Sequence, residues 1–197
     1  MKGPAQPVDV HPGVYPPGED TYILQDALEV FPQDIVLDMG CGSGYISLNL
    51  LSLVERVVAI DIHHEAVINT HENLKKHAAF HKASIVQSNL FAALSPASKF
   101  SVIAFNPPYL PKDDDHTSYD GALVGGERGT EVSEMFINQC REHLAEQGRV
   151  YLVASSLADV KHLQDTMEMN GLATDIAAEE VLFFEKLMVL RGIHERK

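Results

Sequence analysis

Apolar runs typical of buried strands alternate along this chain with segments of helical periodicity, and this alternation restricts the possible folds most strongly. The strand-like runs are residues 34–38, 57–61, 84–87, 101–105 and 149–154. The helix-like segments are residues 19–30, 45–53, 64–77, 129–146 and 157–170. Strands that alternate with helices predict βαβ units, and therefore an α/β fold with a mostly parallel sheet. Nearly continuous apolar runs predict helices on both faces of that sheet.

The two ends of the chain depart from this alternation. Residues 173–180 and 185–191 have no helix between them, which predicts an antiparallel C-terminal hairpin at one edge of the sheet. Residues 1–18 contain five of the ten prolines, which predicts an extended N-terminal arm. We therefore expect an arm at 1–18 followed by a single domain at 19–197.

The bulk composition limits the partners and the compartment. The formal net charge is -13, from 15 Lys+Arg against 28 Asp+Glu, which argues against nucleic acid and favours a basic protein partner. Two cysteines, no signal-peptide pattern and no apolar run of membrane-spanning length predict a cytoplasmic protein without a membrane segment.

Residues 38–44 join the first strand to its helix and predict a ligand site. Gly40, Gly42 and Gly44 let the backbone turn and approach a ligand at the carboxyl end of a central strand. The dinucleotide fingerprint would need its last glycine where this chain has Tyr45. Asp38 would repel a pyrophosphate but suits an ammonium group, so the loop favours S-adenosylmethionine over NAD.

Asp61 ends the second strand, 21 residues beyond Gly40. A carboxylate there can accept hydrogen bonds from both ribose hydroxyls of an adenosine. The alternative is a residue that only caps the strand end.

Asn106-Pro107-Pro108-Tyr109 follows the fourth strand and predicts the catalytic element. The Asn106 side-chain oxygen and the Pro107 carbonyl can each accept one N–H of an amide or exocyclic amine. They would orient this poor nucleophile and stabilise its developing charge, so no strong base is needed. Tyr109 offers a flat face to the planar group and to a sulfonium cation.

These elements together resemble the HemK family of release-factor glutamine methyltransferases, and most of all its short archaeal and eukaryotic branch. The resemblance also covers residues 14–21 and 125–129 and spans nearly the whole chain. It implies a seven-stranded class I methyltransferase (Rossmann-like) fold, without the N-terminal helical domain of the longer bacterial members. It places Tyr15 and Thr21 near the cofactor, and Ile62, Asn89, Leu90 and Asn106 complete the expected cofactor set. Asn89 stands where the family usually has Asp. Its amide oxygen can still accept the hydrogen bond from the adenine amino group, without charge assistance, so we expect cofactor binding to survive in a weaker form.

The resemblance also implies the substrate and a partner. The substrate would be the glutamine of the Gly-Gly-Gln tip of a class I release factor. A small zinc-binding activator protein would pair with residues 84–87, which we expect to form an edge strand because this fold places its third strand outermost.

Alternatives remain at this point. The chain could methylate an exocyclic amine of DNA or RNA, or a protein lysine, or be a scaffold without activity. His77 and His81 have helical metal-ligand spacing but no evident third ligand, so no metal site is predicted. Met135, Phe136 and Ile137 are expected in the core. Asp113, Asp114 and Asp115 lie in a long loop and could steer a basic partner.

Overall fold

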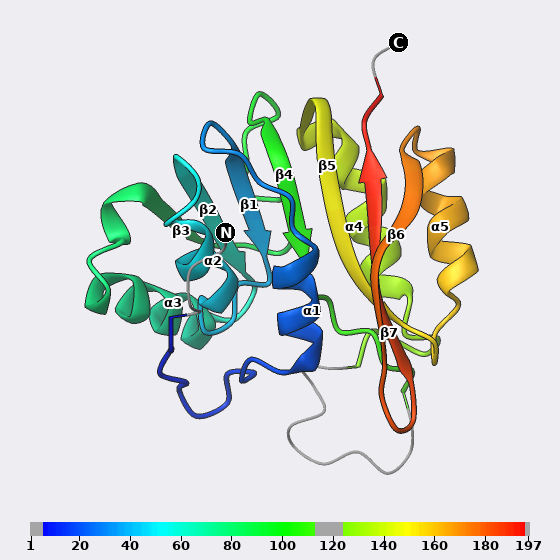
Figure 1. Ribbon diagram of the computed structural model, residues 1–197, viewed down its shortest axis with the longest axis horizontal. Helices are drawn as coiled ribbons and strands as arrows, with labels where there is room; N and C mark the ends of the chain where they lie inside the picture. The colour runs from blue at the N-terminus through cyan, green and yellow to red at the C-terminus, as the bar shows by residue number, and fades with distance from the viewer. Residues whose placement is uncertain (1–5, 113–123, 196–197) are drawn as a thin grey trace.

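A seven-stranded sheet forms the centre of the computed structural model, which describes residues 6–112 and 124–195 (Figure 1). The strand order is β3-β2-β1-β4-β5-β7-β6. The strands are β1 (Ile35–Met39), β2 (Arg56–Asp61), β3 (Ala83–Gln87), β4 (Phe100–Phe105), β5 (Leu144–Ser155), β6 (Ala173–Val181) and β7 (Lys186–Ile193). Strands β1 to β5 pair in parallel, and β7 is antiparallel to both β5 and β6. The predicted mostly parallel sheet with a C-terminal hairpin is confirmed.

Helices cover both faces of the sheet because its strand residues alternate between two apolar clusters. The helices are α1 (Glu19–Ala27), α2 (Tyr45–Leu50), α3 (His64–Lys76), α4 (Glu131–His143) and α5 (Val160–Met169), with a short 3₁₀ turn, η1 (Phe80–Lys82). In β4, Val102 packs in the cluster that α1, α2 and α3 join. Its neighbour Ile103 packs in the cluster of α4 and α5.

Several helices are shorter than their sequence patterns predict, and α1 and α2 each end three residues early, at Ala27 and Leu50. The prediction of a helix over 129–146 is wrong at the C-terminal end, because α4 ends at His143 and β5 begins at Leu144. Residues after Leu144 pair with β4 instead, with a register shift between Phe100 and Val102. The helix expected from residue 157 begins at Val160, because the Asp159 side chain caps it by accepting a hydrogen bond from His162 N at 3.0 Å.

The segment before α1 is attached to the domain by asparagine side chains. Asp9 N donates to Asn73 Oδ1 at 3.0 Å, and His11 N donates to Asn69 Oδ1 at 2.9 Å. Both asparagines lie on α3, so residues 9–11 run along this helix toward the carboxyl ends of the parallel strands (Figure 1).

The strand β3 lies at one end of the sheet, as expected for residues 84–87. It pairs with β2 on its inner side, and its residues are partly buried or exposed. Within residues 6–112 and 124–195, no helix is long and apolar enough to span a bilayer.

Candidate active site

A cavity of about 980 Å³ lies where β1, β2 and β4 end. Its walls come from the segment before α1, the glycine loop after β1, the start of α3 and the residues after β4. The predicted site residues that line it are Tyr15, Thr21, Asp38, Gly40, Gly42, Asp61, Ile62, Asn89, Leu90, Asn106, Pro107 and Pro108. The cavity walls do not include Gly44 or Tyr109. The residues Asp113, Asp114 and Asp115 lie outside the described part of the chain.

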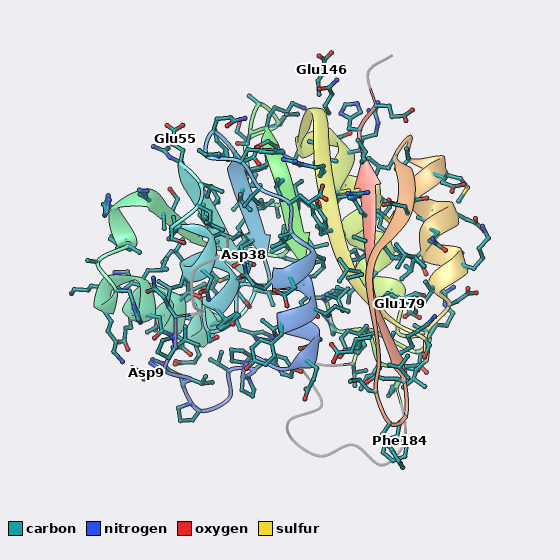
Figure 2. The ribbon with its side chains drawn as sticks, in the orientation of Figure 1. Asp9, Asp38, Glu55, Glu146, Glu179 and Phe184 are labelled. Carbon is teal, nitrogen blue, oxygen red and sulfur yellow. The ribbon has the colours of Figure 1, made fainter. Side chains whose placement is uncertain are left out.

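Asp38 is a buried carboxylate near the carboxyl end of β1, close to the middle of the molecule (Figure 2). Its Oδ2 accepts hydrogen bonds from Ser47 N at 3.0 Å and from Ser47 Oγ. The pKa of Asp38 is raised to about 7. Burial is the main cause and the charge of Asp61 adds to it, whereas the hydrogen bonds from Ser47 act in the opposite direction. Near neutral pH this group therefore gains or loses a proton easily, and a cationic ligand would favour its charged form.

Asp61 is held by two backbone N–H groups. Its Oδ2 accepts from Gly42 N at 3.0 Å, and its Oδ1 accepts from His63 N at 2.9 Å. The bond to Gly42 requires a loop that turns back over β2, and Gly42 adopts a φ of +53° to make that turn. Each carboxylate oxygen keeps a lone pair for a further donor in the cavity.

Asn106 presents an unpaired acceptor at the cavity wall. Its Oδ1 is buried and has no hydrogen-bond partner within the described ranges. Leaving a buried acceptor unpaired costs about 1–3 kcal/mol, so native structures rarely keep one without a reason. A ligand that donates an N–H would remove this cost.

Tyr109 lies behind the cavity wall, with its ring buried among side chains of α1 and the sheet. Its hydroxyl donates to Asp20 Oδ2 at 3.2 Å. Burial and the charge of Asp20 raise its pKa, so the phenol stays protonated and cannot act as a base. The contacts support a role in holding the Asn106–Tyr109 element, and the predicted flat face toward the substrate stays a prediction.

Asp20, on α1, is a site residue that the sequence patterns did not single out. It is 2% exposed, and the same Oδ2 that bonds Tyr109 accepts from the Tyr15 hydroxyl at 3.0 Å. Its Oδ1 accepts from Thr21 N and Thr21 Oγ1. Its only signal in the sequence is its place within residues 14–21, which carry the family resemblance. That signal does not reveal that the hydroxyls of Tyr15, Thr21 and Tyr109 converge on one carboxylate. We infer that Asp20 positions both tyrosines.

Residues 125–129 brace the other side of the Asn106–Tyr109 element. A Cβ on Gly125 would lie 2.3 Å from Pro108 O, and one on Gly129 would lie 2.5 Å from Tyr109 O. Gly125 N also donates to Leu110 O at 3.0 Å. The glycines of this segment are therefore needed for close approach of two backbone stretches.

Met135 was expected in the core with Phe136 and Ile137, and this expectation is wrong for Met135. Phe136 and Ile137 are fully buried, whereas Met135 is 50% exposed on α4 and lines the cavity. No group of three metal-binding side chains occurs within residues 6–112 and 124–195. In these ranges His77 Nε2 instead contacts Pro7 O, and His81 Nδ1 contacts Ala78 O.

Comparison with known proteins agrees with this fold. The family model "Methyltransferase small domain" matches residues 8–180. The putative protein N5-glutamine methyltransferase MJ0928 of Methanocaldococcus jannaschii is 35% identical, over 93% of this chain and 93% of the relative. A chain of the E. cuniculi Mtq2–Trm112 complex, responsible for the methylation of the eRF1 translation termination factor, superposes with a TM-score of 0.70. It is 28% identical over 92% of this chain and 98% of that chain.

A third similarity concerns the fold alone. The T. thermophilus 16S rRNA N2 G1207 methyltransferase RsmC, solved with AdoMet and guanosine, has a TM-score of 0.71. It is 22% identical over 92% of this chain and 44% of that chain. The sheet order and the ligand cavity at its carboxyl edge define a class I methyltransferase, a fold that binds AdoMet in RsmC. The chain belongs to the HemK-type family of protein-glutamine methyltransferases.

Asp20→Asn should lower the rate of methyl transfer by about tenfold or more. Both oxygens of the Asp20 carboxylate accept hydrogen bonds, whereas an amide has only one acceptor oxygen, so some of these bonds would be lost. If Asp20 acts through Tyr109, Tyr109→Phe should lower kcat similarly, and the double variant should be no worse than either single variant. Steady-state kcat and the melting temperature should be measured for all three. Additive losses of kcat, or a loss that only follows stability, would assign Asp20 a merely structural role.

Proposed function

We propose that this chain transfers a methyl group from S-adenosylmethionine to the side-chain amide nitrogen of glutamine in the Gly-Gly-Gln tip of a class I release factor. The buried and unpaired Asn106 Oδ1 carries this proposal. A primary amide presents N–H donors to that oxygen, and its small planar shape suits the space beside Pro107 and Pro108. The names of the relatives support the same substrate class.

The residues of the cavity fit S-adenosylmethionine. Asp38 offers a carboxylate whose charged form an ammonium group would stabilise. Asp61 has both oxygens fixed by backbone N–H groups and facing a cavity, as two ribose hydroxyls require. Ile62, Asn89 and Leu90 line the adjoining wall, where an adenine ring would contact apolar surface and the Asn89 amide. When bound, this cofactor supplies an electrophilic methyl group on a sulfonium.

The residues of this chain have to bind and orient the amide. Asn106 Oδ1 would accept one N–H, and the Pro107 carbonyl would accept the other. These bonds align the nitrogen for in-line attack and stabilise the positive charge that develops on it. Tyr109 cannot take the proton, because its pKa is raised by burial first and by Asp20 second. Once the nitrogen carries the methyl group it is acidic, and its proton passes to water.

Transfer to a nucleobase amine is the rival within the same chemistry, because that group also presents planar N–H donors. The net charge of -13 opposes binding to phosphates. The charge instead suits a basic protein tip, and the rate of methylation should fall as salt rises.

The experiment that tests the function is transfer of labelled methyl to a class I release factor and to its tip Gln→Ala variant, with single-stranded and duplex DNA alongside. We expect label on the release factor alone, at the glutamine. Label on the nucleic acid, or equal label on the Gln→Ala protein, contradicts the proposed substrate.

Asn106→Ala should lower kcat by about a hundredfold or more, as expected for a polar group that stabilises developing charge. The affinity for S-adenosylmethionine, measured by calorimetry, should change little. Asn89→Ala is a matched control at another residue of the same cavity, and it should show the reverse pattern, with weaker cofactor binding and a retained kcat at saturation. Normal turnover in Asn106→Ala would remove this residue from catalysis.

Cofactor affinity should depend on the protonation of Asp38. Its pKa near 7 means that the protonated form dominates at lower pH, and this form cannot pair with an ammonium group. The association constant should therefore fall as pH drops below about 7, by up to about tenfold per unit. Calorimetry from pH 5.5 to 8 measures it. Asp38→Asn should bind weakly at every pH, and an unchanged slope in that variant would assign the titration to another group.

A small zinc-binding activator protein on β3 belongs to the same proposal. The edge position of β3 and the two-protein complex from E. cuniculi support it. Strand addition would satisfy the outer backbone groups of residues 83–87. An isolated chain that is monomeric, soluble and fully active would contradict this expectation.

A further inference from the structure

The hairpin between β6 and β7 ends in two adjacent phenylalanines that are almost fully exposed. Phe183 is 91% exposed and Phe184 is 85% exposed, and with Val181 they are the most exposed large hydrophobic side chains in the described ranges. Their ring centroids lie 4.6 Å apart at an interplanar angle of 86°. Figure 2 shows Phe184 extending from the end of the hairpin. Such a pair leaves a large apolar area in water that a partner could bury.

The tip is anchored rather than loose. Leu182 N donates to Glu185 O at 2.8 Å, which closes the turn that carries both rings. The Glu185 carboxylate accepts a hydrogen bond from Ser155 Oγ, and Lys186 N donates to Ser156 Oγ at 2.8 Å. Leu182 packs against the apolar cluster that contains Tyr109. A preorganised tip loses little conformational entropy when it binds.

The tip lies at the same edge of the sheet as the active-site cavity. Ser155 is the last residue of β5, and β5 is the neighbour of β4, which leads directly into Asn106. Figure 1 shows the hairpin reaching the edge where β1 and β4 end. The charge of Glu185 also adds to burial and Asp20 in raising the pKa of Tyr15 and Tyr109, which places the base of the tip near both phenols.

We propose that the Phe183–Phe184 tip is a docking element for the folded protein that carries the target glutamine, and that it binds an apolar patch next to that residue. The proposal rests on the glutamine substrate proposed above. Glu179 and Glu180 are exposed beside the tip, and Lys186 pairs with Glu179 at 3.1 Å. The partner surface should therefore be apolar with basic residues around it.

The charges near the tip argue against two other occupants. A second copy of this chain would bring its own net charge of -13 to the contact. An anionic membrane surface would be repelled by the same carboxylates. The position of the tip at the same edge as the cavity favours the substrate protein, because an amide pocket alone recognises one side chain and cannot distinguish the protein that presents it.

The test is the double variant Phe183→Ser/Phe184→Ser. Both side chains are exposed, so the fold should be retained, and the melting temperature checks this. The matched control is Met169→Ser, a 77% exposed apolar residue at the end of α5, away from the cavity. Methyl transfer is measured on the folded release factor and on a short peptide with the Gly-Gly-Gln sequence, and calorimetry measures binding of the release factor directly.

We expect the double variant to raise KM and Kd for the release factor by about tenfold or more, as for aromatic interface anchors. Its kcat at saturation and its kinetics on the peptide should match those of the wild type and of Met169→Ser. Unchanged KM and Kd for the release factor would overturn the docking role while leaving the glutamine substrate intact. The docking role would also be overturned if the wild type forms a dimer that the double variant does not form. The same holds if the wild type binds anionic vesicles and the double variant does not. Wild-type protein that labels neither the release factor nor the peptide would contradict the proposed function itself.

Discussion

The carboxylate of Asp20 connects three parts of the chain that meet at the active site. It accepts hydrogen bonds from Tyr15 before α1, from Thr21 on α1, and from Tyr109 after β4. A buried carboxylate costs several kcal/mol unless donors surround it, so the fold can bury Asp20 only with these partners in place. Both phenols stay neutral and remain donors, because burial and Asp20 raise their pKa values. The position of the cavity wall thus depends on one anion.

This constraint explains how the site can keep an unsatisfied acceptor. An unpaired Asn106 oxygen would normally find a partner by local rearrangement. Here the element cannot rearrange, because Tyr109 is attached to Asp20 on one side and Gly125 lies against Pro108 O on the other. Two consecutive prolines remove further freedom at Pro107 and Pro108. The oxygen is therefore oriented before an amide arrives, and binding the amide requires little free energy of reorganisation.

The sheet and the positions of Asp38, Asp61 and Asn106 could be predicted because they follow local patterns, namely apolar periodicity and motifs that end strands. Other cavity residues were expected from the family resemblance. The end of α4 could not, because residues after Leu144 are compatible with a helix until their pairing with β4 is known. Asp20 and Tyr109 are 89 residues apart, so no local pattern reveals their contact. Met135 is adjacent to two core residues and yet faces the cavity, since only part of the surface of α4 packs on the sheet.

The antiparallel placement of β7 has a consequence for how large partners can bind. If β7 were parallel to β6, the two strands would need a crossover connection. That connection would enter β7 at the edge of the sheet opposite the carboxyl ends of the parallel strands. The hairpin instead returns to the carboxyl edge, where β4 also ends and leads into Asn106 (Figure 1). The strand β3 is at the other side of the sheet from β6. A protein paired with β3 and a substrate on the hairpin would therefore occupy separate surfaces, and the chain could hold both during transfer.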